Sequence, residues 1–126
     1  MVHVRTAKPE EIDALLAILD AAILETDRDA VRQSGSDGRT LVAVEDGRVL
    51  GAAVTLPAER GVRLDAIAVR KRRQGQGIGT ALVERLIDRH GRVVAEFDER
   101  VRPFYESLGF EIRERESGRY HGVRTV

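Results

Sequence analysis

Cysteine is absent from this chain, and its absence limits the chemistry that the side chains can perform. Without thiols the protein forms no disulfide, offers no thiolate to a metal ion and has no cysteine nucleophile. Lysine is scarce as well, because Lys8 and Lys71 are the only two. The histidines (His3, His90 and His121) lie far apart, without the spacing of metal ligands. We therefore expect neither a metal site nor catalysis through a covalent cysteine intermediate.

An excess of charge of one sign is also missing, since 21 basic and 21 acidic side chains cancel to a net charge of zero. No overall field draws such a chain to nucleic acid or to an anionic membrane. No apolar run approaches the length of a membrane span, and residues 1–5 alternate like a strand rather than like a signal peptide. We expect a cytoplasmic protein without a nucleic-acid or membrane partner.

The pattern of apolar residues predicts one globular domain over residues 1–126. Alternating apolar and polar residues bounded by turn residues indicate strands, and apolar residues repeated every three or four positions indicate helices. The polar stretch 25–38 predicts a mobile loop over the acceptor side, with room for a short helix over 27–33. Strands are expected at 2–6, 41–44, 49–56, 62–69, 92–97, 110–115 and 120–126, and helices from Pro9, from the glycine turn to His90, and after Asp98.

A glycine-rich turn leads directly from the strand 62–69 into a helix. Gly75, Gly77 and Gly79 stand at alternate positions and leave the backbone N–H groups bare. The positive end of the helix dipole points at the same place. A strand, a glycine turn and a helix in this order are typical of a phosphate site.

Two common phosphate motifs do not fit the turn. A P-loop needs Lys followed by Ser or Thr after its last glycine, and no lysine follows here. A Rossmann fingerprint needs a third small residue where this chain has Thr80 or Leu82, depending on the frame. Glu96 and Asp98 lie at about the distance of a ribose-binding acid, but an antiparallel hairpin precedes the turn. A nicotinamide- or nucleotide-binding protein is therefore only a third hypothesis.

Two motifs resemble the GNAT acetyltransferase superfamily. Gln74-x-x-Gly77-x-Gly79 matches the family's pyrophosphate motif, and the frame that begins at Arg72 matches one step upstream. The segment 101–110, with its Phe-Tyr pair and closing Leu-Gly-Phe, is similar to the family's later helix. The resemblance implies an α/β (α+β) fold. This fold has a mixed, mostly antiparallel sheet with helices on both faces and a central parallel strand pair that splays at the cofactor site.

The same resemblance implies a site for acetyl-CoA (coenzyme A) as cosubstrate, with no metal. The pantetheine arm is expected along the backbone of the strand, and the pyrophosphate at the glycine turn. At least one cation of the run Arg70, Lys71, Arg72 and Arg73 is a candidate to pair with phosphate. The expected cofactor-binding residues are Ile67, Ala68, Val69, Gln74, Gly75, Gln76, Gly77, Ile78, Gly79 and Thr80.

Tyr105 matches the family's tyrosine that acts as general acid on the departing thiolate. A phenol with a pKa near 10 suits that role. The general base stays open between Asp65, Glu96, Asp98 and a water chain, and His121 is a further residue that could approach the site. The family often has Asn where this chain has Asp98, which leaves the contact of that residue open.

The resemblance implies an acyl-CoA-dependent N-acetyltransferase. A primary amine on a small molecule or a peptide would attack the acetyl thioester directly. The alternative is a non-catalytic acyl-CoA-binding regulatory module that kept the cofactor loop without the acceptor chemistry. The terminal hairpin is a candidate edge for a homodimer.

Overall fold

The computed structural model describes residues 1–21 and 27–126, and its strands form one seven-stranded sheet. The strands are β1 (His3–Thr6), β2 (Thr40–Glu45), β3 (Arg48–Pro57), β4 (Val62–Val69), β5 (Arg92–Asp98), β6 (Glu111–Glu116) and β7 (Arg119–Thr125). Their order across the sheet is β1-β2-β3-β4-β5-β7-β6. All neighbours pair antiparallel except β4 and β5, which are parallel. This arrangement confirms the predicted mixed, mostly antiparallel sheet.

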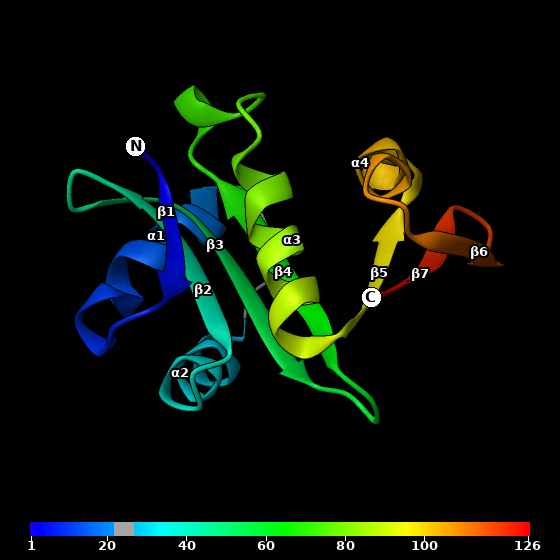
Figure 1. Cartoon of the computed structure of the whole chain (residues 1–126), viewed down its shortest axis with the longest axis horizontal. Coiled ribbons are helices and arrows are strands. Elements are labelled where there is room, and N and C mark those ends of the chain that lie inside the picture. Colours follow the sequence, from blue (N-terminus) through cyan, green and yellow to red (C-terminus); the bar gives the residue numbers. More distant parts are fainter. Residues whose placement is uncertain (22–26) are drawn as a thin grey trace.

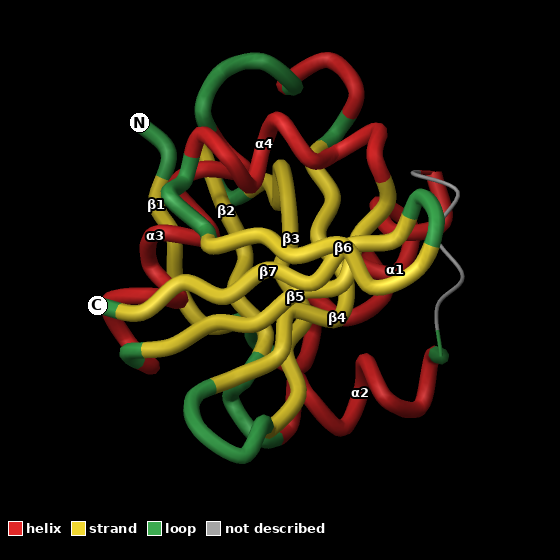
Figure 2. The backbone as a smooth tube through the Cα atoms, turned by 90° about the vertical axis from the view of Figure 1, so that its right-hand side faces the viewer, coloured by secondary structure: helices red, strands yellow, loops and turns green. Residues whose placement is uncertain are grey.

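Helices cover both faces of the sheet, as predicted (Figure 1, Figure 2). They are α1 (Ile12–Ala21), α2 (Arg28–Ser36), α3 (Ile78–His90) and α4 (Arg102–Ser107), with 3-10 turns η1 (Pro9–Glu11), η2 (Lys71–Arg73) and η3 (Glu99–Val101). One hydrophobic core joins α3 and α4 to the sheet, and a second joins α1 and α2 to the other face. None of the helices in the described residues is long and apolar enough to cross a membrane.

The turn between β2 and β3 is the two-residue hairpin that its sequence predicts. Asp46 has φ 52° and Gly47 has φ 77°, so both central residues adopt the left-handed region. Asp and Gly tolerate that region, and a turn with two such residues matches the twist of an antiparallel pair. The hairpin is therefore defined by local sequence alone.

The predicted loop over 25–38 is wrong for residues 28–36, which form α2, whereas the short helix that the sequence allowed over 27–33 is present and extends to Ser36. Asp27 caps this helix, because its carboxylate accepts hydrogen bonds from the N–H groups of Asp29 and Ala30. Val31 and Ser34 are buried against the sheet, so tertiary packing stabilises a segment that looks polar in sequence. Residues 25 and 26 lie outside the described part of the chain.

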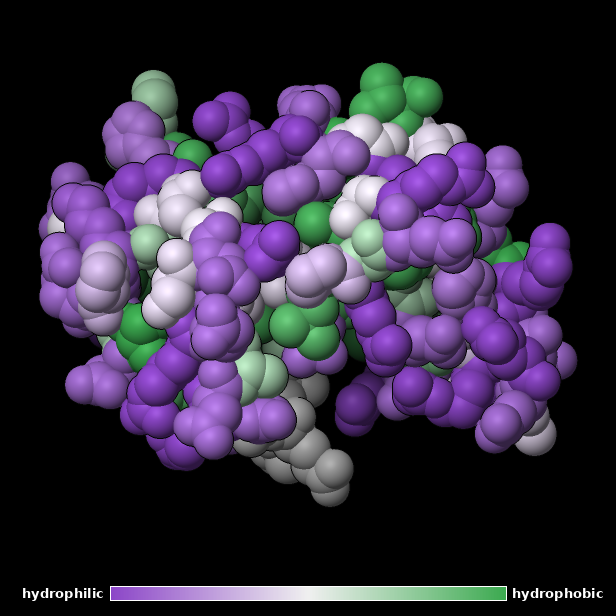
Figure 3. Space-filling model, turned by 90° about the horizontal axis from the view of Figure 1, so that it is seen from below, coloured by the Kyte–Doolittle hydropathy of each residue, from purple (hydrophilic) through white to green (hydrophobic). Residues whose placement is uncertain are grey.

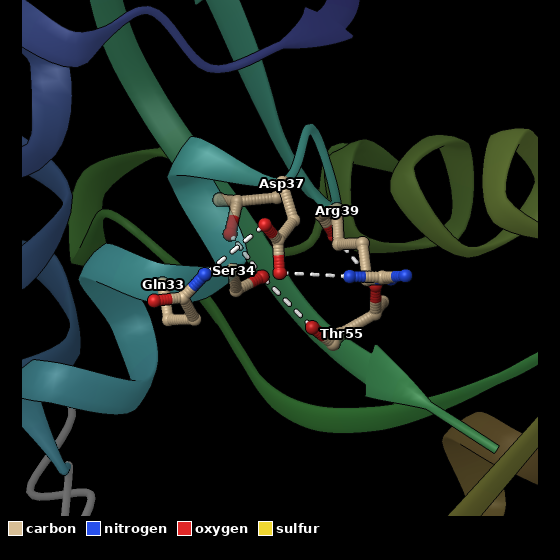
Figure 4. A network of polar contacts seen from close by, with 6 residues as sticks. Gln33, Ser34, Asp37, Arg39 and Thr55 are labelled. Atoms are coloured by element: carbon tan, nitrogen blue, oxygen red, sulfur yellow. Dashed lines mark hydrogen bonds and ion pairs between the residues drawn. The ribbon is translucent and has the colours of Figure 1, made fainter.

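A buried polar network joins α2 to the sheet (Figure 4). The Ser34 hydroxyl donates to the Thr55 carbonyl at 2.8 Å and lies 2.8 Å from the Thr40 hydroxyl. The Thr55 hydroxyl in turn donates to the Arg39 carbonyl at 2.6 Å. All three hydroxyls are thus hydrogen-bonded, which compensates the cost of burying them.

The parallel pair β4 and β5 separates part of the way along its length, as predicted. Their pairing runs from Val62 opposite Val93 to Leu64 opposite Ala95 and then stops. At the next residue, Asp65, β4 has a β-bulge relative to β3. Beyond the bulge, β4 stays paired with β3 while its other edge no longer pairs with β5. Figure 1 shows β5 and β7 leaning away from β4.

Candidate active site

The glycine turn encloses open space between η2 and α3. Gly75 has φ 77° and Gly77 has φ 82°, a left-handed conformation that side chains rarely adopt. A Cβ atom at either position would meet no atom of residues 1–21 or 27–126 within 4 Å. Both glycines therefore provide backbone freedom in a turn whose outer side is free for a ligand.

The start of α3 presents unpaired N–H groups to that space. The first intrahelical hydrogen bond joins the Ala81 N–H to the Gly77 carbonyl, and no side chain in the described part of the chain caps the helix. The N–H groups of Ile78, Gly79 and Thr80 consequently make no hydrogen bond within the described residues. With the helix dipole behind them, they form an anion site built from backbone alone.

Gly79 has a different role from the other two glycines. Its φ is not positive, and a Cβ atom there would lie 3.4 Å from the Phe104 ring and 4.0 Å from Val69. Gly79 thus permits the close approach of α4 to the first turn of α3. The sequence pattern combines two physical requirements, open backbone at the turn and small size at a helix contact.

The basic run 70–73 lies beside the turn. Two of its side chains bond to other protein groups, and the other two are free. Arg73 pairs with Glu45 at 2.9 Å and with the Gln76 side chain at 2.8 Å. Arg70 donates to a β3 carbonyl at 2.7 Å. The side chains of Lys71 and Arg72 are exposed and make no hydrogen bond or ion pair within the described residues. These two are the cations available to phosphate.

A cavity of ≈ 810 Å³ adjoins this loop, between α1, the β2–β3 hairpin and residues 69–74. Its apolar lining comes from Ala17, Ile18, Leu50 and Val69, and Arg48 adds a further cation at the hairpin. Seen from below, the surface is mostly hydrophilic, with a hollow between the part that carries β1–β4 and the part that carries β5–β7 (Figure 3).

Tyr105 is held in an aromatic cluster on the α3 face of the sheet. Its ring stacks on Phe97 of β5, with 4.2 Å between centroids, and meets Phe104 and Phe110 edge-on at 5.1 Å. Burial raises the pKa of the Tyr105 phenol to about 12. The hydroxyl makes no hydrogen bond within the described residues. Every fully buried polar side-chain atom among those residues has a hydrogen-bond partner, so the Tyr105 hydroxyl is not fully buried and reaches the surface. Tyr105 is a neutral proton donor with a free hydroxyl.

The three acids proposed as bases have different surroundings. Asp65 is exposed at the β-bulge, where β4 leaves β5. Asp98 caps η3, because its carboxylate accepts a hydrogen bond from the Arg100 N–H at 3.0 Å. Glu96 lies 3.1 Å from the ring of His121, which stands opposite it on β7. Asp98 therefore has a structural function. The Glu96–His121 pair has no local signature in the sequence, because it depends on the register of β5 with β7.

A family model described as an acetyltransferase (GNAT) domain matches residues 36–112, which is more than half of the chain. This chain belongs to the GNAT acetyltransferase family. It is accordingly an acetyl-CoA-dependent N-acetyltransferase, and acetyl-CoA is its cosubstrate. A search of curated proteins gave no match.

Solved structures share the GNAT fold across the whole chain at low sequence identity. Ard1 of Thermoplasma volcanium superposes with a TM-score of 0.82 at 20% identity, over 99% of this chain and 97% of its own. The ribosomal-protein-S18-alanine N-acetyltransferase of Escherichia coli gives 0.83 at 20%, over 100% and 94%. The N-acetylglutamate synthase of Neisseria gonorrhoeae, solved with coenzyme A and N-acetylglutamate, gives 0.83 at 18%, over 99% of this chain and 35% of its own.

Proposed function

We propose that residues 74–80 bind the pyrophosphate of coenzyme A and that the backbone of Ile67, Ala68 and Val69 receives its pantetheine arm. One observation carries this proposal: the unpaired N–H groups at the start of α3 face a turn kept open by Gly75 and Gly77. The released edge of β4 supports the second part, since β5 does not pair with its backbone groups beside the turn, where the Val69 carbonyl accepts a hydrogen bond from the Gln74 side chain at 3.1 Å. Lys71 and Arg72 add charge for the phosphates.

Tyr105 is proposed as the general acid of the acetyl transfer. Bound acetyl-CoA supplies an activated thioester whose sulfur leaves as a thiolate. The Tyr105 phenol is protonated at neutral pH, and its hydroxyl is free to donate. Phe104 packs on Gly79, so the adjacent Tyr105 is held close to the start of α3 and therefore to the cofactor turn.

The acceptor is proposed to be a primary amine on a small molecule or a peptide. Two of the similar structures are enzymes with acceptors of these two kinds, a ribosomal-protein alanine and glutamate. Further proposals from the sequence are a cytoplasmic location, one acetyltransferase domain over residues 1–126, and a homodimer through the terminal hairpin. Cell fractionation and sedimentation velocity test the first and the last of these.

Ligand binding followed by turnover tests the proposal. At a concentration about 100-fold above its Kd, acetyl-CoA should stabilise the fold by about 2.7 kcal/mol, a rise in Tm of roughly 10 °C for a chain of this size. ATP and NADH should give no rise. Release of free thiol is then measured with L-glutamate, agmatine and an alanine-initiated peptide.

The outcomes separate the hypotheses. Stabilisation with turnover of at least one amine supports the proposal. Stabilisation without any turnover favours the non-catalytic acyl-CoA-binding alternative, and no stabilisation by acetyl-CoA contradicts the proposed cofactor site. A rise in Tm with NADH alone would point back to a nicotinamide-binding protein.

A further inference from the structure

Side chains of β5 alternate between the two faces of the sheet, and this places Glu96 opposite Tyr105. Val93, Ala95 and Phe97 pack in the core that contains α3 and Tyr105. Glu96 therefore points to the other face, on which α1 and α2 lie. An acid and a base that act on one thioester can reach it from the two faces without competing for space.

Glu96 also lies where β4 and β5 separate. The last paired residues are Leu64 and Ala95, so Glu96 is the first β5 residue beyond the paired region. The proposed path of the pantetheine arm runs along the edge of β4 that this separation releases. Glu96 thus borders the place where the thioester would lie.

One carboxylate oxygen of Glu96 is held, and the other is free. Its Oε1 atom lies 3.1 Å from His121 Nδ1 and accepts from an Arg115 guanidinium N–H at 3.4 Å. Its Oε2 atom makes no hydrogen bond within the described residues. The side chains of Glu96 and His121 are 31% and 28% exposed, so the pair is partly shielded yet open to a substrate.

Other charged groups share this face of the sheet. Besides Glu96 they are four acids, four arginines and His121, and they come from β4, β5, β7 and β6. On β4 these are Arg63 and Asp65, on β5 Asp98, on β7 His121 and Arg119, and on β6 Glu111, Arg113, Arg115 and Glu116. Among the described residues, Arg115 and His121 are the charged groups within 4 Å of the Glu96 carboxylate.

We infer that Glu96 is the general base and that His121 is the residue that positions it, an assignment that rests on the proposed cofactor site. The acceptor ammonium gives one proton to Glu96 Oε2, and its nitrogen forms the C–N bond to the acetyl carbon. As the C–S bond breaks, the Tyr105 hydroxyl protonates the sulfur. The second proton that the nitrogen loses returns through solvent to the Tyr105 oxygen, and Glu96 passes its proton to water. One proton is released per turnover.

The variant Glu96→Gln tests the base. With the amine that turns over best in the panel, kcat/KM at pH 7 should fall by about 10²-fold or more, and the deficit should shrink as pH rises and the amine deprotonates in solution. With hydroxylamine, which is uncharged at pH 7, the deficit should nearly disappear. Calorimetry should give an unchanged Kd for coenzyme A, because a loss of that binding would indicate failure of the cofactor site instead.

Matched variants complete the test. Glu114→Gln, an exposed carboxylate on β6, should leave activity and its pH profile unchanged. His121→Ala should lower kcat/KM less than Glu96→Gln does, and His121→Asn, which keeps an N–H donor near the Nδ1 position, should restore part of the loss. A pH-independent deficit that is equal for hydroxylamine would overturn the assignment. So would a pH-dependent deficit in Asp65→Asn that Glu96→Gln lacks.

Discussion

The proton on Tyr105 is the residue-scale feature with the clearest kinetic consequence. Phe keeps the stacking on Phe97, and the hydroxyl makes no hydrogen bond within the described residues, so Tyr105→Phe should fold normally. Removal of a general acid should lower kcat by about 10²-fold. Since burial raises the pKa of Tyr105 to about 12, the phenol stays protonated up to about pH 10.

The loss in Tyr105→Phe should therefore be the same at every pH from about 6 to about 10, which steady-state kinetics in a buffer series measures. A loss that fades within this range would indicate that Tyr105 ionises below about 12. Unchanged turnover at every pH would show that another group protonates the thiolate.

At the scale of the element, the turn before α3 combines a left-handed backbone with an anion site. Gly77→Ala places a Cβ atom in the open space of the turn at φ 82°. The strain should cost about 1 to 2 kcal/mol of stability, and the methyl group and shifted backbone should weaken coenzyme A binding by at least about tenfold. Chemical denaturation and calorimetry measure the two effects.

The hairpin turn between β6 and β7 provides the control for this variant. Gly118 has φ 77° and also has open space around its Cβ position, so Gly118→Ala carries the same backbone strain far from the cofactor turn. It should lose similar stability and keep its affinity for coenzyme A. If both variants lose affinity equally, the effect comes from stability, and the turn has no special role in binding.

Elements defined by neighbouring residues were predictable from sequence, and those defined by distant contacts were not. The strand predicted over 62–69 coincides with β4, and α3 ends at His90 before a left-handed Gly91, as the sequence indicated. The sequence left room for a short helix over 27–33 but favoured a loop, because the stability of α2 depends on burying Val31 and Ser34 against strands that come later in the chain. Helix propensity depends on neighbouring residues and does not reflect such distant contacts.

The candidate site shows the same division. The glycine turn and Tyr105 lie in contiguous motifs and were named from sequence. The Glu96–His121 pair depends on the register of β5 with β7, and the link between Arg73 and Glu45 spans 28 residues. Neither has a local signature. The packing of Gly79 against Phe104 was likewise not predictable, because the motif shows that the residue is small but not which contact requires its small size.

For the molecule as a whole, the sheet separates two cores, and the buried hydroxyl network attaches the α2 layer to it. Ser34→Ala would leave the Thr55 carbonyl without its donor and the Thr40 hydroxyl without its partner. The expected cost is about 1 to 3 kcal/mol, because buried polar groups lose their partners. Ser36→Ala changes an exposed serine of the same helix, and its stability should stay within about 0.5 kcal/mol of the wild type.

Since the cofactor turn is built at the start of α3 on the opposite core, Ser34→Ala should retain the wild-type Kd for coenzyme A at temperatures well below its lowered Tm. Equal stability of the two serine variants would show that the network contributes little, whereas a parallel loss of coenzyme A binding would show that the two cores are energetically coupled through the sheet.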